Sequence, residues 1–151
     1  MSKVNLKQLK KLRELTFASV ADVRVALEEA SGDYEKALAI LKKRGAEIAE
    51  KKKEREVGQG LVESYIHQNG KVGSLVVLLC ETDFVARTDE FKNLAHEIAM
   101  QVTAMNPKDV TGLLKQEYIR DPQVTIEDLV KQAIGKLGEN IVVSKIERFE
   151  L

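Results

Sequence analysis

The residues best suited to chemistry gather in segment 80–88, which reads Cys-Glu-Thr-Asp-Phe-Val-Ala-Arg-Thr. Two carboxylates could serve acid–base catalysis, and a thiol could act as a nucleophile. Glu81 and Asp83 lie too close together in one loop to support a paired-carboxylate mechanism. Cys80 ends an apolar run, where a lone cysteine is most often a small packed hydrophobe. We therefore do not expect an enzyme.

Metal and cofactor patterns are also missing from the sequence. One cysteine and two histidines, His67 and His96, give no zinc-ligand spacing. No glycine pattern of the phosphate-loop or dinucleotide type occurs, and Gly70 belongs to a predicted turn. His96 stands next to Glu97 on a predicted helix and is interpreted as a surface residue. We expect neither a metal ion nor a cofactor.

Binding is the remaining role for this loop, and Phe84 is its main candidate. Its large aromatic ring stands between charged residues. The ring could fold back and fill the core between sheet and helix. Alternatively, the strand before it and the helix after it could present the ring to a partner, as aromatic anchors are presented in binding hot spots. The residues alone leave both interpretations open.

The elements around the loop are predicted from periodicity. Segments 60–67 and 72–80 are strand-like, and Asn69-Gly70 between them is typical of a hairpin turn. The unbroken apolar run of the second strand predicts burial on both faces, hence a central position in the sheet. Thr88 is the predicted N-cap of an amphipathic helix that ends before Asn106-Pro107.

The rest of this unit supplies more helices and a last strand. Residues 108–122 suggest one short helix, and Thr125 starts another that Gly138 terminates. Segment 141–151 is interpreted as an edge strand because charged residues interrupt its alternation. Residues 57–151 are thus predicted to form a three-stranded antiparallel sheet packed with helices.

The N-terminal part, residues 1–45, is predicted to form a three-helix bundle, with Ser19 and Asp33 as N-caps. Gly45 is expected to end or loosen the third helix. Residues 46–56 are helix-forming but polar, which is typical of a solvated linker. The basic run 51–55 could instead touch RNA phosphates, and affinity would then fall steeply with salt. The fold class is α+β.

Composition limits the function further. The 151 residues carry no net charge, which gives no general support for nucleic-acid binding. The longest apolar run is far shorter than the roughly 20 residues of a membrane-spanning helix, and the N-terminus lacks the apolar core of a signal peptide. A single cysteine fits a reducing compartment. We expect a cytoplasmic protein without a membrane partner.

Several segments of the chain resemble one family, the elongation factor Ts proteins, which are guanine-nucleotide exchange factors for bacterial elongation factor Tu. The resemblance covers nearly the whole chain and is carried by residues 12–16, 32–37, 65–73, 80–87 and 137–141. The string Cys-Glu-Thr-Asp-Phe-Val-Ala-Arg at 80–87, with Tyr-Ile-His-Gln-Asn-Gly-Lys-Val-Gly at 65–73, is highly specific.

The resemblance implies a fold, a partner and site residues. The N-terminal helices would form a ubiquitin-associated-like bundle that leans on the nucleotide-binding domain of elongation factor Tu. Phe84 would wedge beside the nucleotide and disturb the Mg²⁺ and phosphate contacts that hold GDP. The partner would be bound in GDP-bound and nucleotide-free forms, with no direct nucleic-acid contact. The residues implied in partner binding are Thr82, Asp83, Phe84, Val85, Leu12, Arg13, Leu137, Gly138 and His67.

Some features depart from the family pattern. The turn at 16–19 reads Thr-Phe-Ala-Ser, where the family usually has Thr-Gly-Ala-Gly. The stretch 107–125 is shorter than in other members, and longer members carry a second core subdomain. A short form could recover that missing half by forming a homodimer through its sheet. The alternative to an exchange factor is a protein-binding module that works through the helical bundle alone.

Overall fold

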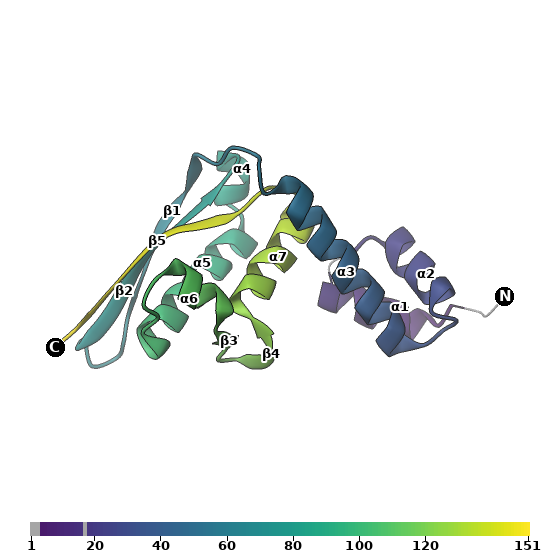
Figure 1. Ribbon diagram of the computed structural model, residues 1–151, viewed down its shortest axis with the longest axis horizontal. Coiled ribbons are helices and arrows are strands. Elements are labelled where there is room, and N and C mark those ends of the chain that lie inside the picture. The colour runs from purple at the N-terminus through teal and green to yellow at the C-terminus, as the bar shows by residue number, and fades with distance from the viewer. Residues whose placement is uncertain (1–3, 17) are drawn as a thin grey trace.

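The computed structural model describes residues 4–16 and 18–151. The molecule is elongated, with a helical bundle at one end and a sheet covered by helices at the other (Figure 1). The helices are α1 (Leu6–Thr16), α2 (Val20–Glu29), α3 (Tyr34–Lys52), α4 (Asp83–Ala86), α5 (Asp89–Met105), α6 (Val110–Lys115) and α7 (Ile126–Leu137). The strands are β1 (Gln59–Ile66), β2 (Val72–Cys80), β3 (Glu117–Tyr118), β4 (Asp121–Thr125) and β5 (Val142–Glu150).

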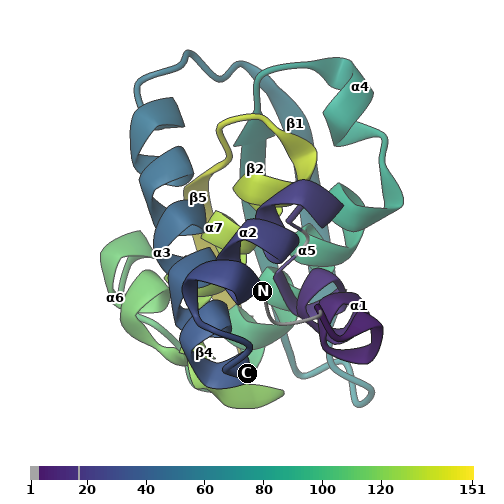
Figure 2. The ribbon, with the colours of Figure 1, turned by 90° about the vertical axis from the view of Figure 1, so that its right-hand side faces the viewer.

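Helices α1, α2 and the first half of α3 form the predicted three-helix bundle (Figure 2). The Ser19 hydroxyl accepts from the amide of Asp22, and the Asp33 carboxylate accepts from the amide of Lys36, so both predicted N-caps are confirmed. The bundle has its own apolar core, which consists of Leu12, Val23, Ala26, Leu27, Ala30, Ala37 and Leu41. Phe17, in the connection predicted at 16–19, lies outside the described residues. The likeness to a ubiquitin-associated domain stays a prediction.

Helix α3 does not end at Gly45, and the expectation of a helix end there is wrong. The helix continues to Lys52, and its second half packs against α7. Ala49 on this half is buried within the core of the second unit. A glycine inside a helix costs about 1 kcal/mol relative to alanine, and this packing offsets that cost. A division at 1–45, 46–56 and 57–151 stays a proposal, since one helix runs through its first boundary.

The sheet has the order β1-β2-β5 with antiparallel neighbours, which confirms the α+β fold class and the central position of β2. The turn between β1 and β2 is tight, since Gly70 has φ +70° and its amide donates to the carbonyl of His67. The register pairs Gln59 with Cys80 and Ile66 with Gly73. The chain therefore leaves β2 for segment 81–88 at the end of the sheet away from this turn.

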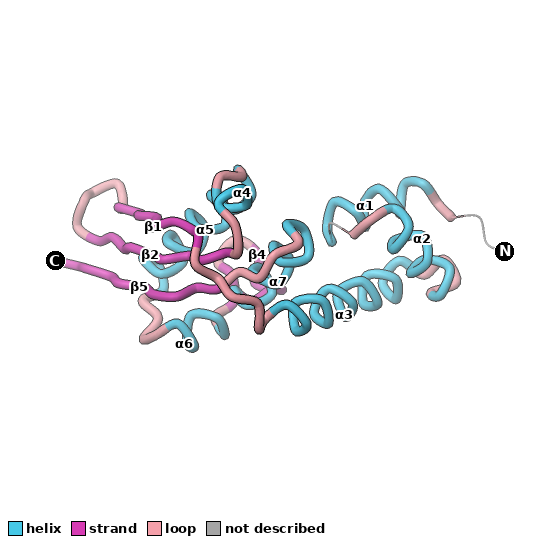
Figure 3. The backbone as a smooth tube through the Cα atoms, turned by 90° about the horizontal axis from the view of Figure 1, so that it is seen from above, coloured by secondary structure: helices cyan, strands magenta, loops and turns pink. Residues whose placement is uncertain are grey.

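Only one face of the sheet is covered by helices of the described chain. Helix α5 packs on β1 and β2 (Figure 3). Side chains such as Val76 and Leu78 on this face are fully buried. The predicted burial of β2 on both faces is wrong. On the opposite face Leu75 of β2 is 46% exposed, beside Val62 of β1 and Phe149 of β5, which are also exposed. We call this surface the open face.

A small hairpin of β3 and β4, which the sequence did not predict, precedes α7. It is held on α5, because Tyr118 and Arg120 both donate to the carboxylate of Glu97, at 2.6 and 2.7 Å. Thr125 begins α7 with a complete capping box, and Gly138 ends it with a left-handed φ of +76°, both as predicted. Across 4–16 and 18–151, no helix combines the length and apolar character needed to traverse a bilayer.

Candidate functional site

The loop after β2 forms the short helix α4, and its central residue Phe84 points away from the protein. Phe84 is 85% exposed, so the interpretation of this ring as a core plug is wrong. The neighbours on α4 behave in the opposite way: Ala86 is buried and Val85 packs against the main core. One side of α4 is thus fixed to the body of the protein while the other side presents an aromatic ring.

Two charged residues flank this ring. Asp83 and Arg87 form an ion pair across one turn of α4, and the side chains of both are more than half exposed. Exposed pairs of this kind contribute little free energy. Either side chain can therefore exchange its partner for a group on another protein at small cost. The carboxylate of Asp83 and the ring of Phe84 together offer a polar and an apolar contact point.

The start of α4 is held by the carboxylate of Glu139, which lies just after α7. This carboxylate accepts hydrogen bonds from the amide of Glu81 at 3.2 Å, the amide of Thr82 at 2.9 Å and the hydroxyl of Thr82 at 2.7 Å. The Thr82 hydroxyl in turn caps α4 by accepting from the amide of Val85 at 3.3 Å. Hydrogen bonds to an ionised group are stronger than neutral ones. Glu139 therefore anchors the segment that carries Phe84.

The neighbouring Asn140 extends this contact to the end of α3. Its backbone amide donates to the Glu81 carboxylate at 3.1 Å. Its side-chain amide, 3% exposed, donates to the carbonyls of Lys53 at 3.1 Å and Arg55 at 2.9 Å. The ends of α3, α4 and α7 meet at this point (Figure 1). Three chain segments that are far apart in sequence are thereby joined near Phe84.

The sequence reasoning missed Glu139 and Asn140 as individual residues, although both lie in the matched segment 137–141. A polar pair directly after a helix-ending glycine was the available signal. That signal is weak, because such residues usually face water. Their partners lie 57 to 87 positions away, so local sequence does not reveal them.

The other predicted site residues are distributed unevenly. Leu137 is half-buried, and Gly138 lies at the C-terminal end of α7, where its carbonyl accepts from Lys52 of α3 at 2.8 Å. Arg13 is exposed on α1. Leu12 is fully buried and packs in the bundle core, and its part in partner binding stays a prediction. His67 is exposed at the hairpin end of β1, roughly 25 Å along the sheet from α4.

The reactive side chains near this loop are not arranged for catalysis. Burial, followed by the negative charge of Glu139, raises the pKa of the Cys80 thiol, which keeps it protonated and a poor nucleophile. His96 is exposed and packs edge-on against Tyr65, with ring centroids 5.7 Å apart. Across residues 4–16 and 18–151, no group of three or more His, Cys, Asp or Glu side chains is placed to hold a metal ion.

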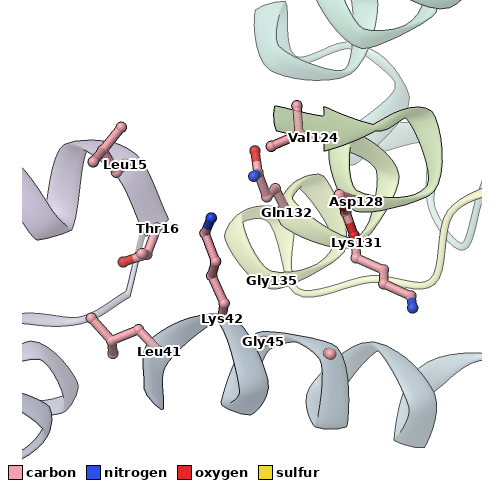
Figure 4. Close-up of a pocket in the computed structure, with 11 residues that line it drawn as sticks. Leu15, Thr16, Leu41, Lys42, Gly45, Val124, Asp128, Lys131, Gln132 and Gly135 are labelled. Carbon is pink, nitrogen blue, oxygen red and sulfur yellow. The ribbon is translucent and has the colours of Figure 1, made fainter. Parts of the chain in front are cut away.

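A cavity of about 130 Å³ separates the bundle from the second unit (Figure 4). Leu15 and Lys42 line it from the bundle, and Val124 and Gln132 line it from β4 and α7. Gly45 and Gly135 form part of its wall, where each lacks a side chain that could fill the space. The lining contains apolar residues and both acidic and basic side chains, but no group of reactive side chains that point at one place. We therefore interpret the cavity as a packing gap between the two units.

Comparison with known proteins gives a consistent result. A family profile described as "Elongation factor TS" matches residues 81–151, which include α4, Glu139 and Asn140. "Elongation factor Ts" of Thermoanaerobacter sp. (strain X514) is 40% identical over 192 residues, covering 97% of this chain and 94% of the relative. The proteins of that name from Fervidobacterium nodosum and Thermotoga maritima are 39% and 40% identical, covering 98% and 96% of their own lengths. Since these alignments exceed 151 residues, the relatives contain internal residues without a counterpart here.

Proposed function

The chain belongs to the elongation factor Ts family, whose members are nucleotide exchange factors for elongation factor Tu, and from this premise we propose that Phe84 is the residue it inserts beside the bound GDP. The observation that carries the proposal is the 85% exposure of Phe84 on a helix whose other side is packed and hydrogen-bonded. Covering such a ring in a partner pocket is worth about 1.5–3 kcal/mol. Pre-positioning it avoids part of the ordering cost of binding.

The proposed mechanism breaks no covalent bond. GDP on a GTP-binding protein is held largely through phosphate contacts and a bridging Mg²⁺. A ring wedged between the elements that carry these contacts displaces them and weakens the nucleotide. Because coupling between two ligands is reciprocal, GDP weakens the exchange factor to the same extent. The factor therefore binds both the GDP-bound and the nucleotide-free partner, and the nucleotide-free form more tightly.

The remaining contacts follow from what is exposed near α4. Asp83 is the proposed hydrogen-bonding neighbour of Phe84, and it can leave its exposed ion pair with Arg87 at little cost. Leu137 and Gly138 directly precede Glu139, which is bonded to Thr82 at the start of α4, and Arg13 is exposed on the bundle surface. His67 would make a separate contact at the hairpin end. We place this activity in the cytoplasm, with no direct contact to nucleic acid.

The open face supports a further part of the proposal, a homodimer. Val62 and Ile66 on β1 and Phe149 on β5, the two strands that flank β2, are each more than 60% exposed. Apolar side chains clustered in this way mark surfaces that another protein covers. A second copy offers the same face in return, as a two-fold dimer requires. Light scattering at micromolar concentration is expected to report a dimer; a monomer would contradict this part of the proposal.

Stopped-flow release of a fluorescent GDP analogue from elongation factor Tu tests the central claim. The wild-type chain is expected to accelerate release, and Phe84→Ala to lose most of the acceleration while it keeps its circular dichroism spectrum and melting temperature. Met105→Ala, which removes another exposed apolar side chain far along α5, is the matched control and should accelerate normally. Full acceleration by Phe84→Ala would refute the wedge.

The alternative is a binding module that works through the bundle without exchange. The bundle does expose apolar side chains, among them Leu6 at 79% and Leu15 at 49%. That alternative predicts binding to a partner with no change in GDP release. It also predicts that Phe84→Ala binds as the wild type does.

A further inference from the structure

Helix α4 is too short to be stable by itself. It has four residues, whereas isolated helices are marginal below about 12–15 residues because the first turn is costly to form. Its inward residues Val85 and Ala86 fix its depth against the core. Both belong to the second half of α4, so the start of the helix needs contacts of its own. The direction of this start decides where the ring of Phe84 points.

Glu139 supplies the missing constraint. Its carboxylate accepts all three donors that precede α4, namely the amides of Glu81 and Thr82 and the hydroxyl of Thr82. Three bonds from two adjacent residues define both the position and the orientation of the backbone at Thr82. The hydroxyl of Thr82 passes this constraint into α4 by capping the amide of Val85. Phe84 lies between these two residues.

Asn140 joins this arrangement to the helix that carries the bundle. Its backbone amide is bonded to Glu81, and its side chain is bonded to the carbonyls of Lys53 and Arg55 just after α3. Arg55 also approaches the Glu81 carboxylate, at 3.7 Å. We call Glu81, Glu139 and Asn140 the clamp.

We propose that Glu139, through the clamp, is the positioning residue for Phe84, and that the clamp holds the Phe84 helix and the end of α3 as one unit. The inference rests on the proposed function for its effect on GDP release, but its effect on local structure is independent of that function. Glu139 itself acts through Thr82 and Phe84 and is not assigned a contact with the nucleotide. A carboxylate suits this task because it accepts from several donors and offers none.

Amide hydrogen exchange in the free protein tests the structural part. Glu139→Ala should speed exchange at the amides of Glu81, Thr82 and Val85 by about tenfold or more, since each loses a hydrogen bond or the cap that depends on it. Glu139→Gln keeps one acceptor oxygen and should give a smaller change. Glu54→Ala, which removes an exposed carboxylate near the same place, is the control and should leave these amides unchanged. Unchanged exchange in Glu139→Ala would overturn the proposal.

A double-mutant comparison tests the functional part. Glu139→Ala should reduce the acceleration of GDP release by about tenfold or more, with partial rescue in Glu139→Gln. Combining Glu139→Ala with Phe84→Ala should be no worse than Phe84→Ala alone, because a residue that acts only through Phe84 has nothing left to position. Additive losses, or normal release with Glu139→Ala, would overturn the positioning role.

The two proposals fail in different ways. If the wild-type chain does not accelerate GDP release, the proposed function fails while hydrogen exchange still decides the clamp. If Phe84→Ala loses acceleration and Glu139→Ala keeps it, the clamp fails while the wedge stands. A melting temperature for each variant identifies global destabilisation, and hydrogen exchange in β2 and α5 shows that the core is intact.

Discussion

Replacing Asn140 with aspartate tests the hydrogen bonds at the end of α3 with a minimal change in shape. The wild-type side-chain amide is buried and donates to two backbone carbonyls, those of Lys53 and Arg55. The variant replaces this NH2 donor with a carboxylate oxygen, which faces the two carbonyl oxygens and cannot donate to them. It also places a negative charge near Glu81. A partly buried carbonyl left without its partner costs up to about 1–3 kcal/mol. With the unpaired charge added, we expect a loss of about 3–5 kcal/mol in the free energy of unfolding.

Urea unfolding at several pH values measures this loss. With a slope of about 2 kcal/mol per molar urea, the midpoint should fall by roughly 1.5–2.5 M at neutral pH. Burial, the two carbonyls and the negative Glu81 all favour the neutral form of the introduced carboxyl, so its folded pKa lies above its unfolded value of about 3.9. A carboxyl group whose pKa is raised on folding contributes stability at pH values below its unfolded pKa. That contribution is lost as the pH rises through the folded pKa.

The deficit of Asn140→Asp should therefore be smallest below about pH 4 and should grow toward neutrality. Asn93→Asp, an exposed change of the same kind on α5, is the matched control and should stay within about 0.5 kcal/mol of the wild type. A deficit under about 1 kcal/mol, or one that does not change with pH, would show that Asn140 does not hold the end of α3 in solution.

Three further predictions concern the frame that carries the site. Gly60→Ala should lower the free energy of unfolding in urea by at least about 2 kcal/mol, because φ is +149° and the new methyl would lie 2.0 Å from the carbonyl oxygen of Leu78. Its control is Gly45→Ala in α3, where the new methyl meets open space and should raise the free energy of unfolding by up to about 1 kcal/mol. Thr125→Ala should cost about 1 kcal/mol by removing the capping box of α7, and equal melting temperatures would contradict this. Burial, and then the hydrogen bond to Glu97, raises the pKa of Tyr118 far above its usual range. The hydroxyl therefore stabilises the folded protein below about pH 10 and progressively less above it. The decline of unfolding free energy at alkaline pH should be shallower in Tyr118→Phe.

Local sequence patterns predicted the turns and helix caps around the site well, because these features depend on residues close together in the sequence. The hairpin turn at Asn69-Gly70 and the caps at Ser19, Asp33, Thr88 and Thr125 involve partners within three or four residues. An apolar run reports which side chains can be buried, but it does not say what covers them. The central place of β2 was therefore correct while its burial on both faces was not.

Long-range packing decided the features that were missed. Gly45 is a plausible helix end by propensity, but contacts of α3 with α7 carry the helix past it. The hairpin of β3 and β4 has strands of two and five residues, too short for a pattern, and is held instead by Glu97 and the buried Gln101 of α5. Phe84 could be read either way until the placement of Val85 and Ala86 was known.

The continuity of α3 has a consequence for how this chain can change its length. A helix of 19 residues spans roughly 28 Å and turns about 100° with each residue. Inserting or deleting one residue near Gly45 would swing the bundle, with Arg13 on its surface, around the helix axis and away from its orientation relative to Phe84. Adding two full turns, about seven residues, would restore the rotation of the bundle about the helix axis and would only lengthen α3. Length variation within α3 should therefore follow the helical repeat, whereas loops elsewhere can vary one residue at a time.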